Sequence, residues 1–526
     1  MYWQHLVADF PGLARAVVER LSLNKVAKAL SHNKSSIGDW LRGASPSKAE
    51  DVGGVLRLAL KNGIEIERFQ TFAPIYDFSP MLSYEEKVEK DPPELNWLVK
   101  IQLPPERKAT FCGKDFQSPL GVASSPLLGD DRWAKLMLDL SFVGPSTFKT
   151  RRTGWKTSWD PPQIAFVLEP PDLRIYDPDL PPEVLVTFKR NETEDSVLNL
   201  VNSIGVPSEK TATLWQETYQ RIKLLDGGDC VGLSVMAEGD ARQDFIKDIQ
   251  LVAHKAAEVL PIFVEYNPSC PNLEKDNDLW TDLALLKKVC AEIASILSPR
   301  GIPLVIKLPY LRGNRLKEVL KAIGKHVSGI SFHNTIRVRP VVRNQRDNKL
   351  YPAFQSRAFG GLSGPCTFAV GLEGLNELVQ FKEELGFDFD IAALGGATTK
   401  SDVVQFLNAG ADIVQVCTAA MFDPLLAWKT RYHFKASDLG FTPQQASALL
   451  SARNQSEIES QKNAFEAQGQ IQRRSPHQAV PWEKFVSVWN QWMEQQPPTL
   501  PSRPLRLPAP KSISQWIREF TDEKNK

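Results

Sequence analysis

Eight short apolar runs, separated by amphipathic helical stretches, dominate the middle of this 526-residue chain. Nearly every run is rich in β-branched residues and is followed by a helical pattern such as DFIKDIQLVAHKAAEVL. The runs lie at 119–124, 142–149, 230–236, 261–267, 303–309, 329–334, 389–396 and 412–418. Strands that are apolar along their whole length are buried on both faces, as in a parallel sheet. Eight such units over about 300 residues predict an α/β fold, a (β/α)8 TIM barrel rather than an open doubly wound sheet.

Other kinds of pattern flank the barrel. We divide the chain into a small all-α module, a polar proline-containing linker, the barrel and a helical, proline-rich extension, at 1–70, 71–107, 108–435 and 436–526. The extension contains the strip PPTLPSRPLRLPAP, which is typical of an extended linker. The two longest interruptions of the barrel pattern, 150–208 and 337–370, are predicted to be loops at the catalytic mouth.

Composition excludes several classes of protein. The 63 basic and 62 acidic side chains argue against coating nucleic acid or an anionic membrane through bulk charge. There is no apolar run of about 18 residues and no secretory signal, so we expect a soluble, cytoplasmic protein without a membrane partner. The six cysteines form no CxxC pair and the seven histidines form no evident set, so no metal is predicted.

Polar residues gather where the predicted strands end, which is where barrel enzymes place their active sites. These residues are Ser124, Lys149, Asn267, Lys307, Asn334, Gly395, Gly396 and Thr418. A packed core alone would not collect two lysines and two asparagines there, although each could be a solvated strand end. The turns LGGATTKSD and VCTAAM, together with GGLSGP, predict a phosphate site built from backbone N–H groups.

The segment VEYNPSCPNLE (264–274) is the sharpest local signal. The side-chain amides of Asn267 and Asn272 offer paired donors and acceptors that suit a planar, amide-rich ligand. The thiol of Cys270 can act as a base if its pKa is lowered below the free value of about 8.5. The alternative is that Cys270 is an inert buried thiol.

At this point the sequence resembles a known family. The N-x-S-C-P-N segment resembles the catalytic loop of the cysteine-class dihydroorotate dehydrogenases, which are FMN-dependent barrel flavoproteins. The resemblance continues in order through PLGVASSP, PSTFKTRR, VNSIGVP, LVIKLPY, SFHNTI, FGGLSGP, ALGGATT and VQVCTAAM. It implies an oxidoreductase of pyrimidine biosynthesis that acts on a CH–CH group. Such an enzyme converts dihydroorotate to orotate, with Cys270 as the base and a hydride passing to flavin N5.

The resemblance also implies roles for individual residues. Cys270 and Lys149 would be catalytic. The implied substrate contacts are Lys149, Asn202, Ile204, Gly205, Asn267, Asn272, Asn334 and Thr335. The implied FMN contacts are Ala123, Ser124, Lys149, Lys307, Gly364, Gly395, Gly396, Cys417 and Thr418. The interval between Lys149 and Asn202 is longer than in compact members of the family, which leaves open a flavoenzyme that acts on another cyclic amide.

Residues 21–46, LSLNKVAKALSHNKSSIGDWLRGASP, resemble the helix-turn-helix of small phage-repressor-like proteins. Ala27 would lie in the first helix, and Ile37 and Trp40 on the buried side of the second. The residues that would face DNA are Lys34, Ser35, Ser36 and Arg42. A second hypothesis is therefore a DNA-binding regulator whose barrel senses flavin or a pyrimidine. A docking or dimerisation module, a homodimer and the identity of the electron acceptor also stay open.

Overall fold

The computed structural model describes residues 7–430 with short gaps. The gaps lie at 8, 45, 47, 63, 65, 67–73, 94–108, 191–196, 238–241, 269–281 and 355–356. The predictions for Cys270, Asn272 and the extension at 436–526 therefore lie outside the described residues.

Eight parallel strands form a barrel in chain order. They are β3 (Leu120–Val122), β4 (Ser146–Arg151), β10 (Val231–Val235), β11 (Val264–Tyr266), β12 (Leu304–Lys307), β13 (Gly329–Phe332), β17 (Asp390–Ala393) and β18 (Ile413–Val416). Two hydrogen bonds join β3 to the β4 side of the ring, from Val122 N–H to Ser146 Oγ at 2.9 Å and from Gly144 N–H to the Leu120 carbonyl at 3.0 Å. Each strand overlaps its predicted run, and the (β/α)8 barrel is confirmed.

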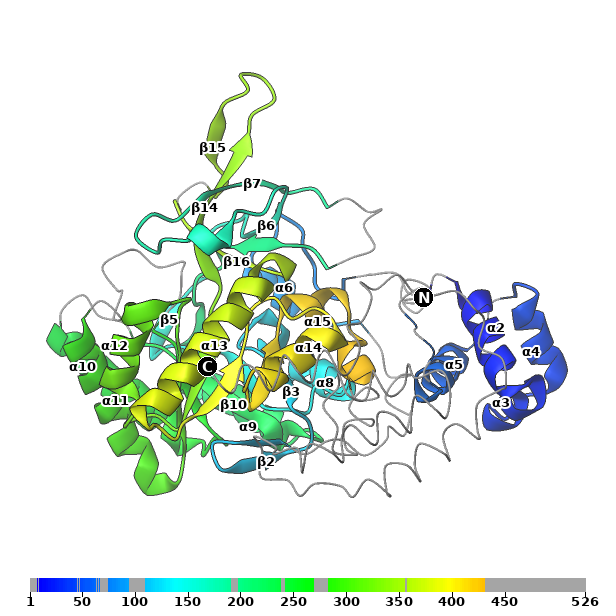
Figure 1. The fold of residues 1–526 in the computed structure, drawn as a ribbon, viewed down its shortest axis with the longest axis horizontal. Coiled ribbons are helices and arrows are strands. Elements are labelled where there is room, and N and C mark those ends of the chain that lie inside the picture. Colours follow the sequence, from blue (N-terminus) through cyan, green and yellow to red (C-terminus); the bar gives the residue numbers. More distant parts are fainter. Residues whose placement is uncertain are drawn as a thin grey trace, which may run out of the picture.

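Helices cover the outside of the barrel (Figure 1). They are α8 (Asp131–Asp139), α9 (Ala212–Lys223), α10 (Arg242–Glu258), α11 (Leu283–Leu297), α12 (Gly313–Ile323), α13 (Phe368–Leu385) and α14 (Lys400–Asn408). The short helix α15 (Thr418–Phe422) follows β18 at the C-terminal end of the barrel strands. In α12, Leu316, Val319, Leu320 and Ile323 recur at helical spacing and are all buried, so one face of the helix packs on the strands. Of the helices described, none is both long enough and apolar enough to cross a membrane.

The two interruptions predicted as loops each contribute β-strands as well as loop segments. Their strands form one six-stranded sheet in the order β15-β14-β16-β8-β6-β7. The bounds are β6 (Ile164–Val167), β7 (Glu183–Thr187), β8 (Leu200–Asn202), β14 (Ile336–Arg343), β15 (Leu350–Pro352) and β16 (Gly360–Ser363). A separate ribbon pairs β5 (Gly154–Lys156) with β9 (Ser208–Thr211). Backbone N–H and C=O groups that are buried over a barrel need partners, and strand pairing between the two insertions supplies them.

A short hairpin packs at the opposite end of the barrel. It consists of β1 (Ala109–Phe111) and β2 (Lys114–Phe116). The N–H of Cys112, in its turn, donates to the carboxylate of Asp390, the first residue of β17. The hairpin therefore lies at the N-terminal ends of the strands, away from the mouth where the inserted sheet lies.

The predicted N-terminal module is helical. It contains α2 (Phe10–Leu21), α3 (Leu23–Ala29), α4 (Lys34–Leu41) and α5 (Ala49–Lys61), and Figure 1 draws it beside the barrel. Ala27, Ile37 and Trp40 are buried in its small core, where the Phe10 and Trp40 rings meet edge to face at 5.6 Å. The Asn33 side chain caps α4 by accepting the Ser36 N–H at 2.8 Å.

Candidate active site

A large cleft opens at the C-terminal ends of the barrel strands, beneath the inserted sheet. It holds about 1200 Å³ of empty space, its open mouth included. The predicted site residues that are described all line it: Ala123, Ser124, Lys149, Asn202, Ile204, Gly205, Asn267, Lys307, Asn334, Thr335, Gly364, Gly395, Gly396, Cys417 and Thr418. The structure thus brings these residues together around one cleft, while their individual roles stay predictions.

Polar side chains from four strand ends form a continuous network along this cleft. Ser124 Oγ lies 3.1 Å from Thr150 Oγ1, which also accepts a hydrogen bond from Asn267 Nδ2 at 3.1 Å. Asn334 Nδ2 donates to Asn267 Oδ1 at 3.2 Å, and Asn334 Oδ1 accepts the Thr335 N–H at 2.9 Å. The first three of these contacts link one strand end to another, and the fourth lies within one segment, so the amides have defined orientations before any ligand binds.

Two lysines lie within the cleft, and both are buried. Lys307 Nζ is 3.8 Å from Glu265 Oε1, and Glu265, which has no exposed surface, also accepts the Ser331 hydroxyl at 2.8 Å. Burial raises the pKa of the Cys417 thiol, while the nearby positive charges of Lys307 and Lys149 oppose that rise. A cleft with two buried ammonium groups favours a ligand that carries negative charge or develops it.

Glycines form a close-packed wall on one side of the cleft. Gly364, Gly395 and Gly396 have φ values of +108°, +103° and +80°, which favour glycine. A Cβ on Gly395 would lie 2.5 Å from His333 Nε2, and one on Gly396 would lie 2.3 Å from the Phe368 backbone nitrogen. All three glycines line the cleft with backbone atoms alone, which suits a phosphate group. Within the described ranges, no group of three or more His, Cys, Asp or Glu residues could hold a metal ion.

Sequence reasoning missed several polar residues of this region. Thr150 and Gln415 line the cleft, and Gln415 Nε2 donates to the Pro145 carbonyl at 2.8 Å and to Thr147 Oγ1 at 2.9 Å. Glu265, whose carboxylate lies 3.8 Å from Lys307 Nζ, was also missed. The available signal was a polar residue inside an otherwise apolar strand, as in VEY and IVQV.

His333 is buried beside the cleft. Its Nδ1 lies 2.5 Å from the Asn334 carbonyl oxygen, and its ring meets that of Tyr310 edge to face at 5.1 Å. Burial lowers the pKa of His333 to about 4, so the imidazole is neutral at physiological pH. His333 is therefore a packed residue directly after β13.

Comparisons with known proteins point to one family. A family model described as dihydroorotate dehydrogenase matches residues 190–430. A dihydroorotate dehydrogenase of Dictyostelium discoideum is 25% identical over 366 residues, which cover 68% of this chain and 96% of that protein. The catalytic subunit of dihydroorotate dehydrogenase B (NAD(+)) of Staphylococcus carnosus is 25% identical over 228 residues, which cover 43% of this chain and 68% of the subunit.

The name of a third relative specifies quinone, rather than NAD(+), as the electron acceptor. The mitochondrial dihydroorotate dehydrogenase (quinone) of Schizosaccharomyces pombe is 28% identical over 211 residues, which cover 39% of this chain and 44% of that protein. The named relatives thus agree on dihydroorotate and differ in the acceptor. The matched segment, together with the (β/α)8 barrel and the cleft at its mouth, makes this chain similar to the dihydroorotate dehydrogenases.

Proposed function

We propose that this chain oxidises dihydroorotate to orotate with FMN as its cofactor. The observation that carries the proposal is the cleft, where two buried lysines, a network of amides and a glycine wall meet at the strand ends. The family match and the names of the relatives support the same reaction.

The residues around the cleft fit a flavin mononucleotide. The glycine wall and Thr418 would hold the phosphate, because backbone N–H groups and a hydroxyl suit a phosphate group where no side chain fits. Ala123, Ser124, Lys307 and Cys417 would contact the ring system. When bound, FMN supplies a hydride acceptor at its N5 atom.

The remaining polar groups would bind the substrate ring. Asn202, Asn267, Asn334 and Thr335, with Asn272 outside the described residues, would pair with its amide edges. Lys149 would bind the carboxylate. A site of this kind rejects analogues that leave its buried polar groups unpaired.

In the reaction, the substrate loses a proton from C5 and a hydride from C6, and a C5=C6 double bond forms. Cys270, as a thiolate, would take the proton on its sulfur. Lys307 would stabilise negative charge that develops beside it, and because it is already held near Glu265 it needs little reorganisation.

The test is an anaerobic titration of the purified, FMN-loaded protein with dihydroorotate, followed by flavin absorbance. We expect stoichiometric bleaching, slowed about 10²- to 10⁴-fold in Cys270→Ala because a general base contributes that much. Cys112→Ala, in the hairpin at the far end of the barrel, is the matched control and should bleach like the unmodified chain. Bound flavin that stays oxidised with dihydroorotate would exclude the proposed reaction and move the assignment to another cyclic amide.

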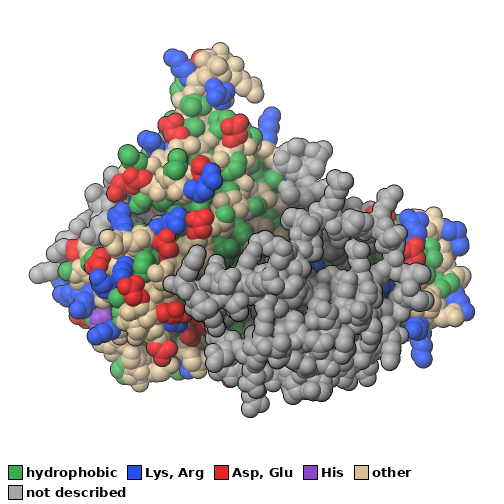
Figure 2. Space-filling view, viewed as in Figure 1, with side chains coloured by type: hydrophobic (Ala, Val, Ile, Leu, Met, Phe, Trp, Pro, Cys, Tyr) green, Lys and Arg blue, Asp and Glu red, His purple; other side chains and the backbone are tan. Residues whose placement is uncertain are grey.

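One observation favours a second function, DNA binding by the N-terminal module. Lys25, Lys28 and Lys34 are all exposed on α3 and α4, and Figure 2 shows Lys and Arg side chains at the outer end of the module. The acidic Asp39 on α4 is ion-paired with Arg42 at 2.5 Å. This surface therefore presents positive charge next to the start of a helix, as DNA-reading helices do.

That function predicts salt-dependent binding of the full chain to a pool of random-sequence duplex DNA. Lys34→Ala should reduce the slope of log affinity against log salt by about 1, because one phosphate contact is lost. Lys349→Ala, on the β14–β15 hairpin, should leave the slope unchanged. Binding that is absent at low salt, or equal effects of the two substitutions, would exclude a DNA-reading role.

A further inference from the structure

A segment that precedes the barrel crosses its mouth. We call residues 74–93, which include α6 (Tyr84–Glu89), the strap. The Ile75 N–H donates to the Met421 carbonyl at 2.8 Å, and the Phe78 ring stacks on Phe422 at 5.1 Å. Phe78 also meets Phe166 of β6 at 5.5 Å. The strap therefore contacts both α15 of the barrel and the inserted sheet.

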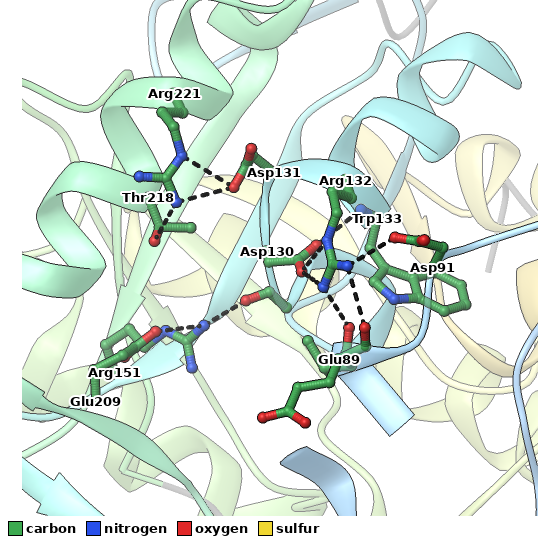
Figure 3. Close-up of polar contacts among 12 residues, drawn as sticks. Glu89, Asp91, Asp130, Asp131, Arg132, Trp133, Arg151, Glu209, Thr218 and Arg221 are labelled. Atoms are coloured by element: carbon green, nitrogen blue, oxygen red, sulfur yellow. Dashed lines mark hydrogen bonds and ion pairs between the residues drawn. The ribbon is translucent and has the colours of Figure 1, made fainter. Parts of the chain in front are cut away.

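The far end of the strap is anchored by one arginine. Arg132, in the first turn of α8, donates to the Val88 and Glu89 carbonyls at 2.8 and 3.1 Å. It also binds the carboxylates of Asp91 at 2.8 Å and Asp130 at 2.7 Å (Figure 3). With both ends attached to the barrel, the strap has a defined position.

Between these anchors, Glu85 reaches the insertion that follows β5. Its two carboxylate oxygens accept the Ser158 N–H at 2.6 Å and the Ser158 hydroxyl at 2.5 Å. Ser158 is buried, and hydrogen bonds to an ionised carboxylate are stronger than neutral ones. The strap is thus joined to the insertion by a two-point, charge-assisted contact.

The residues next to Ser158 hold the 202–206 loop, which lines the cleft. The Trp159 N–H donates to the Ile204 carbonyl at 3.0 Å. The Gln163 side-chain Nε2 donates to Ser158 Oγ at 2.7 Å, and the Gln163 backbone carbonyl accepts the Ser203 N–H at 2.7 Å. The 202–206 loop is therefore hydrogen-bonded to the same short segment that Glu85 binds.

The Trp159 ring itself packs against Gly205. A Cβ on Gly205 would lie 2.9 Å from the Trp159 ring, and the φ of Gly205 is +82°. The cations of Lys156 and Arg357 each lie 5.8 Å from the ring centroid. The indole is thus held in place, and it fixes the path of the loop backbone.

We propose that Glu85, Ser158 and Trp159 form a latch that holds the 202–206 loop in its substrate-binding position. Substrate affinity is then set partly by a strap that precedes the barrel and by a long insertion, neither of which is a barrel strand or helix. The latch residues do not contact the reacting atoms, so they are positioning residues. The effect on affinity rests on the proposed function, whereas the effect on the loop does not.

The test compares Glu85→Ala with Glu86→Ala on the same helix. Glu86 closes the capping box of α6 with Ser83, so its loss weakens the helix without removing a contact to Ser158. We expect Glu85→Ala to raise amide hydrogen exchange in a peptide spanning 200–208 and to raise the KM for dihydroorotate about tenfold, with kcat nearly unchanged. Glu85→Gln, which keeps one acceptor oxygen, should restore most of the protection.

Two readouts separate the latch from the proposed reaction. Suppose that exchange at 200–208 increases in Glu85→Ala and not in Glu86→Ala, but that dihydroorotate does not reduce the bound flavin. This result supports the latch and excludes dihydroorotate as the substrate. Equal exchange at 200–208 in the Glu85→Ala, Glu86→Ala and unmodified proteins overturns the latch. If Glu85→Ala fails to fold, Trp159→Ala gives the same comparison from the other end, with Trp159→Phe as its conservative control.

Discussion

The two walls of the cleft are built differently. The barrel rim consists of residues at strand ends, and its polar groups bond from one strand end to another, as Asn334 after β13 does with Asn267 after β11. The cover consists of inserted strands and presents mainly apolar side chains such as Ile164, Leu200 and Leu362. This difference suggests separate roles for the two walls: under the proposed function, the rim would supply charge and hydrogen bonds, while the cover would exclude water and position the substrate. Substitutions in the rim should therefore affect the chemical step, and those in the cover should affect affinity.

The largest effect is expected at Lys307. Lys307→Met should slow the reduction of bound flavin by dihydroorotate by about 10²- to 10³-fold, the usual cost of one electrostatic donor. It should also destabilise the fold by about 3–5 kcal/mol, because the buried Glu265 carboxylate loses its cation. The double variant Lys307→Met, Glu265→Gln should recover thermal stability but not the rate. Recovery of both would show that Lys307 has only a structural role.

The next effect is expected at the glycine wall. Gly395→Val should weaken FMN retention about 100-fold, because a side chain would collide with His333 and would strain a backbone with φ of +103°. Equilibrium dialysis of the purified protein against FMN measures this. Gly386→Val has a similar left-handed backbone with nothing within 4 Å of a Cβ, so it is the control for strain alone. Equal FMN affinity in the two variants would show that the phosphate group does not bind at the glycine wall.

A smaller effect should distinguish rim from cover directly. Asn202→Ala, in the cover, should raise the KM for dihydroorotate about tenfold with little change in kcat, since it removes the proposed substrate contact and the bond to the Gly361 carbonyl. Asn334→Ala, in the rim, should lower kcat as well, because it disturbs the network that orients Asn267. Steady-state kinetics of both variants checks this. The same changes in KM and kcat in both variants would contradict the distinction between the two walls.

The smallest effect concerns pH and stability. Because burial lowers the folded-state pKa of His333 to about 4, below an unfolded value of about 6.5, the folded state holds fewer protons between these values. The stability from neutral His333 is complete above pH 6.5 and is lost as the pH falls towards 4. Between pH 7.5 and 5.5 the loss should be about 1 kcal/mol. Denaturant unfolding of the unmodified chain and of His333→Gln checks this, since the variant should lack that component.

Much of the rim could be predicted from sequence. A barrel strand places its last residues at the mouth, so Lys307 or Asn334 could be located from the end of an apolar run. The hydrogen-bond and ion-pair partners of these residues were harder to predict. Glu265 and Lys307 lie on neighbouring strands, yet nothing in either run says which polar residues share the barrel interior.

The cover was predicted less well. Its strands come from two insertions that were read as loops, and all of them except β14 have five residues or fewer. Their pairing, for example Ile164 with Asn202 and Asn202 with Gly361, links segments far apart in the chain. Strand propensity depends on such pairing, so local sequence carries only a weak signal.

The sequence by itself therefore determined the class of fold, the chain order of the eight strands and the residues at their ends, because these follow from local hydrophobic periodicity and strand direction. Only the tertiary structure decided that the insertions make a sheet and that Glu85 meets Ser158 across 73 residues. Contacts of that kind depend on how separate segments pack, and burial rewards them only after the chain has closed the intervening loops.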